Sequence, residues 1–81
     1  MNKIDKLNFD SVPSLWDKRA SLFKANTVDL EDISSIDVSG MAILVKWAKA
    51  QKDQKLHLIN VPVSAMNLIN TYRLGQLFVL D

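Results

Sequence analysis

The sequence contains no cysteine, one histidine, two glycines and two prolines among 81 residues. Without cysteine, disulfides, thiolate metal sites and cysteine nucleophiles are all excluded. Few glycines and prolines together with 48% hydrophobic residues indicate an ordered chain, and the length suits a single domain over residues 1–81. Charge is balanced at a net +1 with no long basic block, which argues against nucleic acid as a partner.

Long apolar runs are also missing. No stretch approaches the ~18 apolar residues of a membrane span, and the first six residues lack the apolar run of a secretory signal. The sequence therefore predicts a soluble cytoplasmic protein.

What the sequence does contain is an alternation of strand and helix patterns. Strands are predicted at Ile4–Leu7 (weakly), Thr27–Leu30, Lys55–Ile59 and Leu77–Leu80, with a strand end or turn at Ile33–Asp37. Helices are predicted from Asp10 or Ser11 to about Asn26, from Gly40 to Lys52, and from Val63 or Ser64 to Tyr72 with Gly75 as the C-terminal cap. This order predicts an α/β fold: one layer of mostly parallel strands with about three helices packed on it. Trp16 is expected to be the largest buried group of the first helix.

Groups suited to catalysis are scarce. His57 lies mid-strand between Leu56 and Leu58, and alternation turns it away from the face that those leucines use. Four carboxylates, Asp29, Glu31, Asp32 and Asp37, could offer oxygen ligands to a hard cation, but their spacing matches no metal loop. No glycine-rich phosphate-binding loop is present. We therefore predict no catalytic, cofactor-binding or metal site and no enzyme activity; a small hydrolase or ligand-binding enzyme would need a polar pocket near His57 or the carboxylates.

The most informative segment is Ile36–Ala42, where the pattern changes from the strand period to the helix period. Such junctions place polar side chains and free backbone N–H groups at the carboxyl edge of a sheet. A phosphate on Ser39 would meet the positive end of the following helix dipole. The simpler interpretation, favoured about two to one, is that Asp37 or Ser39 caps the helix.

The helix after this junction carries a second clue. One face holds the apolar residues Met41, Leu44, Val45 and Ala48. Ile43 and Trp47 point about 110° to 150° away from the centre of that face. Two interpretations are equally supported: a wide buried stripe covered by neighbouring helices, or an apolar binding pair flanked by Lys46 and Lys49.

These residues carry a recognisable pattern. Val28-Asp29-Leu30 and Ile33 precede Ile36-Asp37-Val38-Ser39-Gly40-Met41-Ala42, and Asn8-Phe9-Asp10-Ser11-Val12 precedes the first helix. The pattern resembles the STAS domain, the family of anti-sigma-factor antagonists and transporter-associated modules, over residues 4–80. Its signature is a hydrophobic-Asp-Leu strand followed by an Asp-Ser-Ser-Gly-Leu-like loop.

Within that family, residues 8–16 look most like the small cytoplasmic subunits of ABC transporters that maintain outer-membrane lipid asymmetry. The resemblance implies that the partner is the ATPase subunit of an ABC phospholipid transporter, and that the chain reaches the inner face of the cytoplasmic membrane only through this partner. The implied binding residues are Asp37, Val38, Ser39, Gly40 and Met41, with Ile43 and Trp47 as apolar anchors. In this branch a threonine usually follows the aspartate, and Val38 stands there instead.

The phosphorylated branch implies an alternative. Its acceptor serine directly precedes the loop glycine, and that position is Ser39 here. The alternative is a phosphorylation-switched antagonist whose partner is an anti-sigma factor kinase. STAS domains usually begin with an additional strand, whereas this chain begins almost at the second strand of that pattern. Comparison with the family therefore predicts a short or missing N-terminal strand. An unpaired strand edge would favour a homo-oligomer or stabilisation by the partner.

Overall fold

The computed structural model describes residues 2–52 and 55–80, which form an α/β fold with parallel strands. A four-stranded sheet has the order β1-β3-β5-β6, with bounds Asn2–Lys3, Thr27–Asp29, Leu56–Ile59 and Phe78–Leu80. A separate two-stranded sheet pairs β2 (Lys6–Leu7) with β4 (Ser35–Ile36). The predicted α/β class with parallel strands is confirmed. Of the predicted first strand Ile4–Leu7, only Lys6–Leu7 is a strand (β2), and β1 precedes it and pairs in the other sheet.

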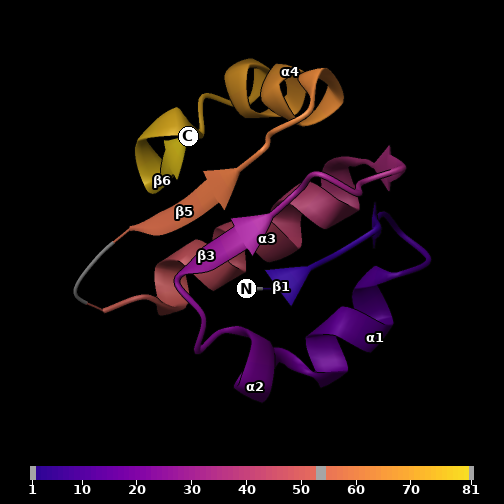
Figure 1. The fold of residues 1–81 in the computed structure, drawn as a ribbon, viewed down its shortest axis with the longest axis vertical. Coiled ribbons are helices and arrows are strands. Elements are labelled where there is room, and N and C mark those ends of the chain that lie inside the picture. Colours follow the sequence, from indigo (N-terminus) through magenta and orange to yellow (C-terminus); the bar gives the residue numbers. More distant parts are fainter. Residues whose placement is uncertain (1, 53–54, 81) are drawn as a thin grey trace.

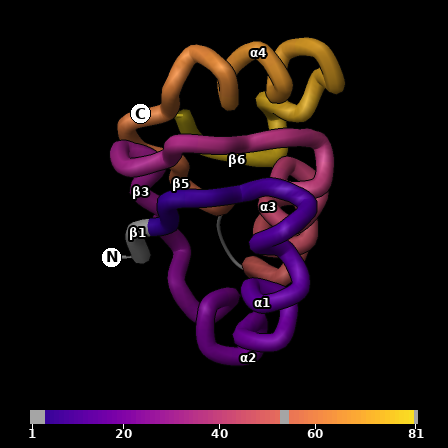
Figure 2. The backbone as a smooth tube through the Cα atoms, turned by 90° about the vertical axis from the view of Figure 1, so that its right-hand side faces the viewer, coloured from indigo at the N-terminus to yellow at the C-terminus, as the bar shows by residue number. Residues whose placement is uncertain are grey.

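Helices connect the parallel strands, which need crossovers rather than tight turns. Their bounds are α1 Val12–Asp17, α2 Arg19–Leu22, α3 Val38–Ala50 and α4 Val63–Thr71, with a 3₁₀ turn η1 at Gly75–Leu77. In Figure 1, α3 lies behind the sheet, with α1 and α2 along one side of the view and α4 along the other. Figure 2, turned by 90°, separates the labelled strands β1, β3 and β5 from α3. Helix α3 is therefore the central element of the helical layer.

The two faces of the sheet follow from strand alternation. Leu56 and Leu58 are buried, whereas His57 and Ile59 between and after them are half-buried. Register places Leu58 beside Val28 on one side and Leu80 on the other, in a row that faces the core. His57 aligns instead with Thr27 and Val79 in the opposite row. The predicted orientation of His57 away from the leucine face is confirmed.

Tryptophan burial reverses the sequence expectation. Trp16 is 39% exposed, whereas Trp47 is 1% exposed and is the largest fully buried side chain of the described residues. The Trp47 ring stacks on Phe23 at a centroid distance of 5.4 Å, and its Nε1–H donates to the Ala25 carbonyl oxygen at 2.9 Å. The prediction that Trp16 is buried was wrong. The segment after α2 packs on Trp47 instead, through the Phe23 ring and the Ala25 carbonyl oxygen.

The helix ends differ from the prediction in two places. The first helix is broken at Lys18, which lies between α1 and α2. At the end of α4, Arg73 rather than Gly75 takes the left-handed conformation, with φ 55°. The Leu74 amide donates to Ile69 O at 2.9 Å and the Arg73 amide to Asn70 O at 3.2 Å, which is a Schellman closure. Gly75 begins η1 instead, so its assignment as the cap of α4 was wrong.

Candidate docking site at the start of helix α3

Hydrogen bonds join the loop before α1 to the loop before α3, although the two are distant in sequence. The Asn8 Nδ2–H donates to Ser35 Oγ at 2.9 Å, and the Phe9 amide donates to Asp37 Oδ2 at 3.0 Å. Ser11 closes the first loop, because its hydroxyl donates to Lys6 O at 2.8 Å. The loop before α1 and the loop before α3 thus form one surface, which the sequence did not reveal for residues 8–11.

Asp37 is the residue that joins them. It caps α3, since its Oδ1 accepts the Gly40 amide at 3.0 Å while Oδ2 accepts the Phe9 amide. The hydrogen bonds from the Gly40 and Phe9 amides, with a smaller contribution from Ser39, lower the pKa of the Asp37 carboxyl below its ordinary value. The cap predicted at Asp37 or Ser39 is confirmed at Asp37. This carboxylate therefore links the loop before α1 to the first turn of α3.

Gly40 permits α3 to approach β2 closely. A Cβ placed on Gly40 would lie 1.7 Å from the Leu7 carbonyl oxygen and 2.3 Å from its carbonyl carbon. The Asp37 amide donates to that same oxygen at 3.0 Å. The close contact therefore sets the first turn of α3 directly against β2.

The predicted binding residues divide into exposed and buried groups. Val38 is 52% exposed and Ser39 is half-buried, and both belong to the first turn of α3. Gly40 and Met41 are buried and support this turn from inside. Ile43 and Trp47 are 3% and 1% exposed, so the wide buried stripe is the correct interpretation. Their assignment as surface anchors was wrong because α1, α2 and the segment after α2 cover that side of α3.

Exposed apolar side chains occur on α3 and on the segments packed beside it. Phe9 (74% exposed), Trp16, Val38 and Tyr72 are four of the five large exposed apolar side chains of the described residues, and we call them the apolar patch. Phe9 is tied to Asp37 by its amide. Sequence reasoning missed Phe9 and Tyr72 as site residues: Phe9 lies among polar residues without periodicity, and Tyr72 matched the buried face of its helix.

Two hollows flank the exposed side of α3 near the patch. The Ser39 hollow, of about 220 Å³, is lined by Val12, Trp16, Ser39, Ala42, Ile43 and Lys46. The Tyr72 hollow, of about 290 Å³, is lined by Val38, Met41, Ala42, Val45, Tyr72 and Leu74. Ala42 contributes to both, so α3 forms a ridge between two largely apolar depressions. A protein surface with matching projections could dock on such a ridge.

Two of the carboxylates considered as cation ligands, Asp29 and Asp37, accept hydrogen bonds from neighbouring amides. Asp29 is buried, and its Oδ1 accepts the Glu31 amide at 2.9 Å and the Asn60 side-chain amide at 3.1 Å. Over residues 2–52 and 55–80, no group of three or more His, Asp or Glu side chains is arranged to hold a metal ion. None of the helices in the described ranges is both long and apolar enough to cross a membrane.

Comparison of the chain with protein-family models, curated proteins and solved structures finds no match. Function must therefore be argued from the residues and the geometry of this site.

Proposed function

We propose that the chain is a non-enzymatic, STAS-type interaction module that docks on the ATPase subunit of an ABC phospholipid transporter, as MlaB-like proteins do. The docking surface is the first turn of α3 with the apolar patch around it. The observation that carries the proposal is the exposure of Phe9, Trp16, Val38 and Tyr72 on α3 and the segments beside it, with the first turn of α3 capped by Asp37. The resemblance of residues 8–16 and 36–42 to the family supports the choice of partner.

The composition of the surface favours a protein partner. Contiguous exposed apolar side chains on a small soluble domain mark interaction sites, and aromatic residues are enriched among binding hot spots. The hydrogen bonds to Asp37 hold the two loops in a fixed arrangement. A surface ordered before binding loses little conformational entropy when the partner docks.

The proposed mechanism is allosteric. A docked module changes the activity of an ATPase only if it binds one arrangement of that subunit more tightly than another. The ridge of α3 between the Ser39 and Tyr72 hollows is a shape that would fit one such arrangement better. No catalytic group of the module itself is needed.

A pair of matched substitutions tests this proposal. Val38 and Val63 are each the first residue of a helix and are 52% and 76% exposed. An aspartate at this helix position is favourable to the helix, so neither Val38→Asp nor Val63→Asp should reduce stability. Burying an unpaired charge costs at least about 1.4 kcal/mol, so Val38→Asp should weaken ATPase binding tenfold or more, with Val63→Asp unchanged.

The measurement is calorimetric titration of each variant into the ATPase subunit of an ABC phospholipid transporter from the same organism. Equal affinity of the Val38→Asp variant and the wild type would show that docking uses another surface. Equal loss in both variants would indicate a non-specific effect of the added charge.

A second candidate function is a phosphorylation-controlled antagonist of an anti-sigma factor kinase. Two observations favour it: Ser39 is the second residue of α3, at the positive end of the helix dipole, and Lys46 lines the same hollow. Intact mass after incubation with a cognate kinase tests it. This alternative requires the addition of one phosphate to the wild type and none to the Ser39→Ala variant.

A further inference from the structure

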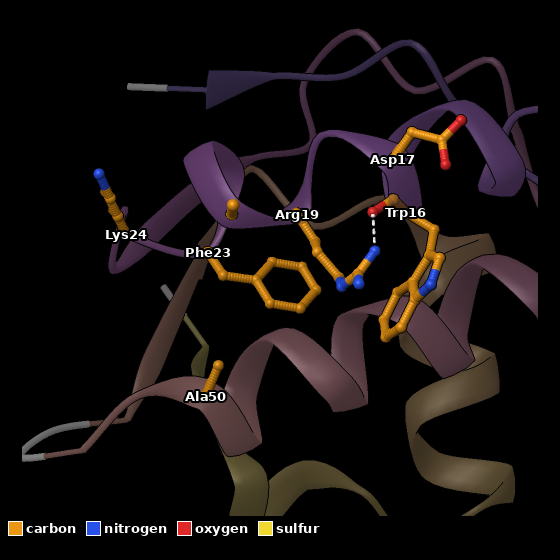
Figure 3. A pocket seen from close by; sticks show the side chains of 7 residues that line it. Trp16, Asp17, Arg19, Phe23, Lys24 and Ala50 are labelled. Carbon is orange, nitrogen blue, oxygen red and sulfur yellow. Dashed lines mark hydrogen bonds between the residues drawn. The ribbon is translucent and has the colours of Figure 1, made fainter.

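A groove runs between α3 and the α1–α2 segment. Its first part is the Ser39 hollow, and its second part is a larger hollow of about 550 Å³ lined by Trp16, Asp17, Arg19, Ala20, Phe23, Lys24 and Ala50. We call the second part the Arg19 hollow. Trp16 lines both hollows, so the two hollows adjoin at this side chain. Figure 3 shows Trp16, Arg19 and Phe23 projecting from the α1–α2 segment and Ala50 on the opposite wall.

The two ends of the groove differ in chemistry. The end at Ser39 is walled mainly by Val12, Ile43 and the Trp16 ring, with Lys46 at its rim. The other end contains two cationic side chains, Arg19 and Lys24, against one carboxylate, Asp17. In Figure 3 the Asp17 carboxylate points away from the space between Phe23 and Ala50. The apolar Ser39 hollow thus adjoins the Arg19 hollow, which carries an excess of cationic side chains and is called the channel below.

Arg19 is held in place at the centre of the channel. Its Nη1–H donates to Trp16 O at 2.9 Å, and its Cζ lies 4.3 Å from the centroid of the Trp16 ring. Figure 3 places the guanidinium between the Trp16 and Phe23 rings. Within the described residues the Arg19 guanidinium makes one hydrogen bond, the one to Trp16 O. Most of its N–H donors are therefore available to a ligand. A guanidinium that is already oriented suits a carboxylate, which it can bind with two parallel hydrogen bonds.

The opposite wall has the same sign of charge. Helix α3 carries Lys46 and Lys49, both exposed, and its sequence from Val38 to Ala50 contains no acidic residue. Arg19 and Lys24 line the Arg19 hollow and Lys46 lines the adjoining Ser39 hollow, so the two hollows together favour an anionic group over a cationic one. Because the surface is concave, a protein segment fills it better than a flat membrane would.

We propose that this groove binds a short acidic amphipathic segment of a partner protein. An apolar side chain of the segment enters the Ser39 hollow, and its carboxylates meet Arg19, Lys24 and the Lys46 side of α3. Ser39 and Ala50, which line the two hollows, are separated along α3 by a rise of about 16 Å, which is the length of roughly eleven helical residues. The inference rests on the proposed docking function, because the groove begins at Ser39 in the docking surface.

A peptide pair tests the inference on the full chain. The probe is a helical peptide of about twelve residues with leucines at one end of one face and glutamates along the rest, and its twin has glutamine for every glutamate. Binding is followed by amide NMR, in which the indole N–H signal of Trp16 should shift while that of buried Trp47 should not. The acidic peptide should bind at least about fivefold more tightly than its twin at low salt.

Adjacent cations supply the control. Arg19 lines the groove, whereas exposed Lys18 lines a different hollow with Ile4 and Lys6. Arg19→Gln should weaken the acidic peptide about fivefold, and Lys18→Gln should leave its affinity unchanged. Equal binding of the two peptides, or equal effects of the two substitutions, would overturn the inference. Arg19-dependent binding to phosphatidylglycerol-rich vesicles without binding of the acidic peptide would also overturn it.

The docking function and the groove can fail separately. Val38 lies outside the groove, so Val38→Asp should block the ATPase but not the peptide. If Arg19→Gln leaves peptide binding intact while Val38→Asp still blocks the ATPase, only the groove assignment falls. If Val38→Asp leaves ATPase binding intact while Arg19→Gln weakens peptide binding, the ATPase proposal falls instead.

Discussion

Gly40 shows how one residue determines the position of the site. An added Cβ would overlap the Leu7 carbonyl group, which is backbone of β2 and cannot rotate away. This overlap can be removed only if α3 moves away from β2. We expect Gly40→Ala to lower the free energy of unfolding by about 3 kcal/mol or more.

Gly75→Ala is the matched control. The nearest atom to a Cβ at Gly75 is Ile69 Cγ2 at 4.0 Å, which is ordinary contact. This substitution should be neutral or stabilising by up to about 1 kcal/mol, because alanine reduces the freedom of the unfolded chain. Urea denaturation measures both. Similar stabilities for the two variants would contradict the close contact of α3 with β2.

Asp37 predicts a pH dependence of stability. Its pKa is lowered in the folded chain by hydrogen bonds from the Gly40 and Phe9 amides. The carboxylate therefore stabilises the fold above the unfolded pKa, and this contribution is lost as the pH falls through the lower, folded pKa. Asparagine can still cap the helix but does not titrate.

The wild type should thus be more stable than Asp37→Asn at neutral pH, and the difference should shrink on acidification. Denaturation of both proteins between about pH 7 and pH 2 provides the comparison. A difference that stays constant over that range would mean that the Asp37 charge does not contribute.

At the residue scale, the sequence predicted Asp37 as a cap because a change of period marks a helix start. It did not predict the role of Phe9, whose amide contacts a residue 28 positions away. Such a contact depends on the path of the chain and has no local signature. Trp16 was misplaced for a related reason: periodicity identifies an apolar face, but not which apolar side chain another element covers.

At the element scale, α3 shows where periodicity is insufficient. The stripe read from Met41 and Leu44 is real, but it extends around the helix to Ile43 and Trp47, all of which are buried. The width of a stripe depends on how many elements pack against a helix. Two helical segments and the chain after α2 contact α3 on that side, and no local pattern specifies this.

Trp47 therefore supports the fold and is not a docking residue. Trp47→Phe removes the hydrogen bond to Ala25 O and leaves that oxygen without this donor. The expected loss in the free energy of unfolding is about 1–3 kcal/mol. Trp16→Phe, at a 39% exposed position, should cost less than about 1 kcal/mol.

Thermal denaturation followed by far-ultraviolet circular dichroism compares these two variants. A larger loss for Trp16→Phe than for Trp47→Phe would reverse the assignment of the core. ATPase binding by folded Trp47→Phe should match the wild type, since the side chain is not part of the docking surface.

At the scale of the whole molecule, the α/β class follows from the sequence because buried strands and amphipathic helices alternate along it. The division into a four-stranded and a two-stranded sheet does not follow, since β2 and β4 are two residues each and too short for a recognisable period. Strand β1 at the edge of the main sheet is equally short. Self-association through a strand edge stays a prediction.

The same division into two sheets positions the proposed site. The β2–β4 pair brings the loop before α1 against the loop before α3, and the Phe9 amide there contacts Asp37, which precedes Val38. The docking surface is thus a property of the assembled molecule rather than of the 36–42 segment alone.

Amide hydrogen–deuterium exchange of the chain, alone and bound to the ATPase subunit, tests this central claim most directly. Docking at the start of α3 predicts slower exchange in the complex over residues 37–46 and 8–16, with exchange in β5 and at the start of α4 unchanged. Slower exchange confined to β5 or to the start of α4, with residues 37–46 unaffected, would contradict it.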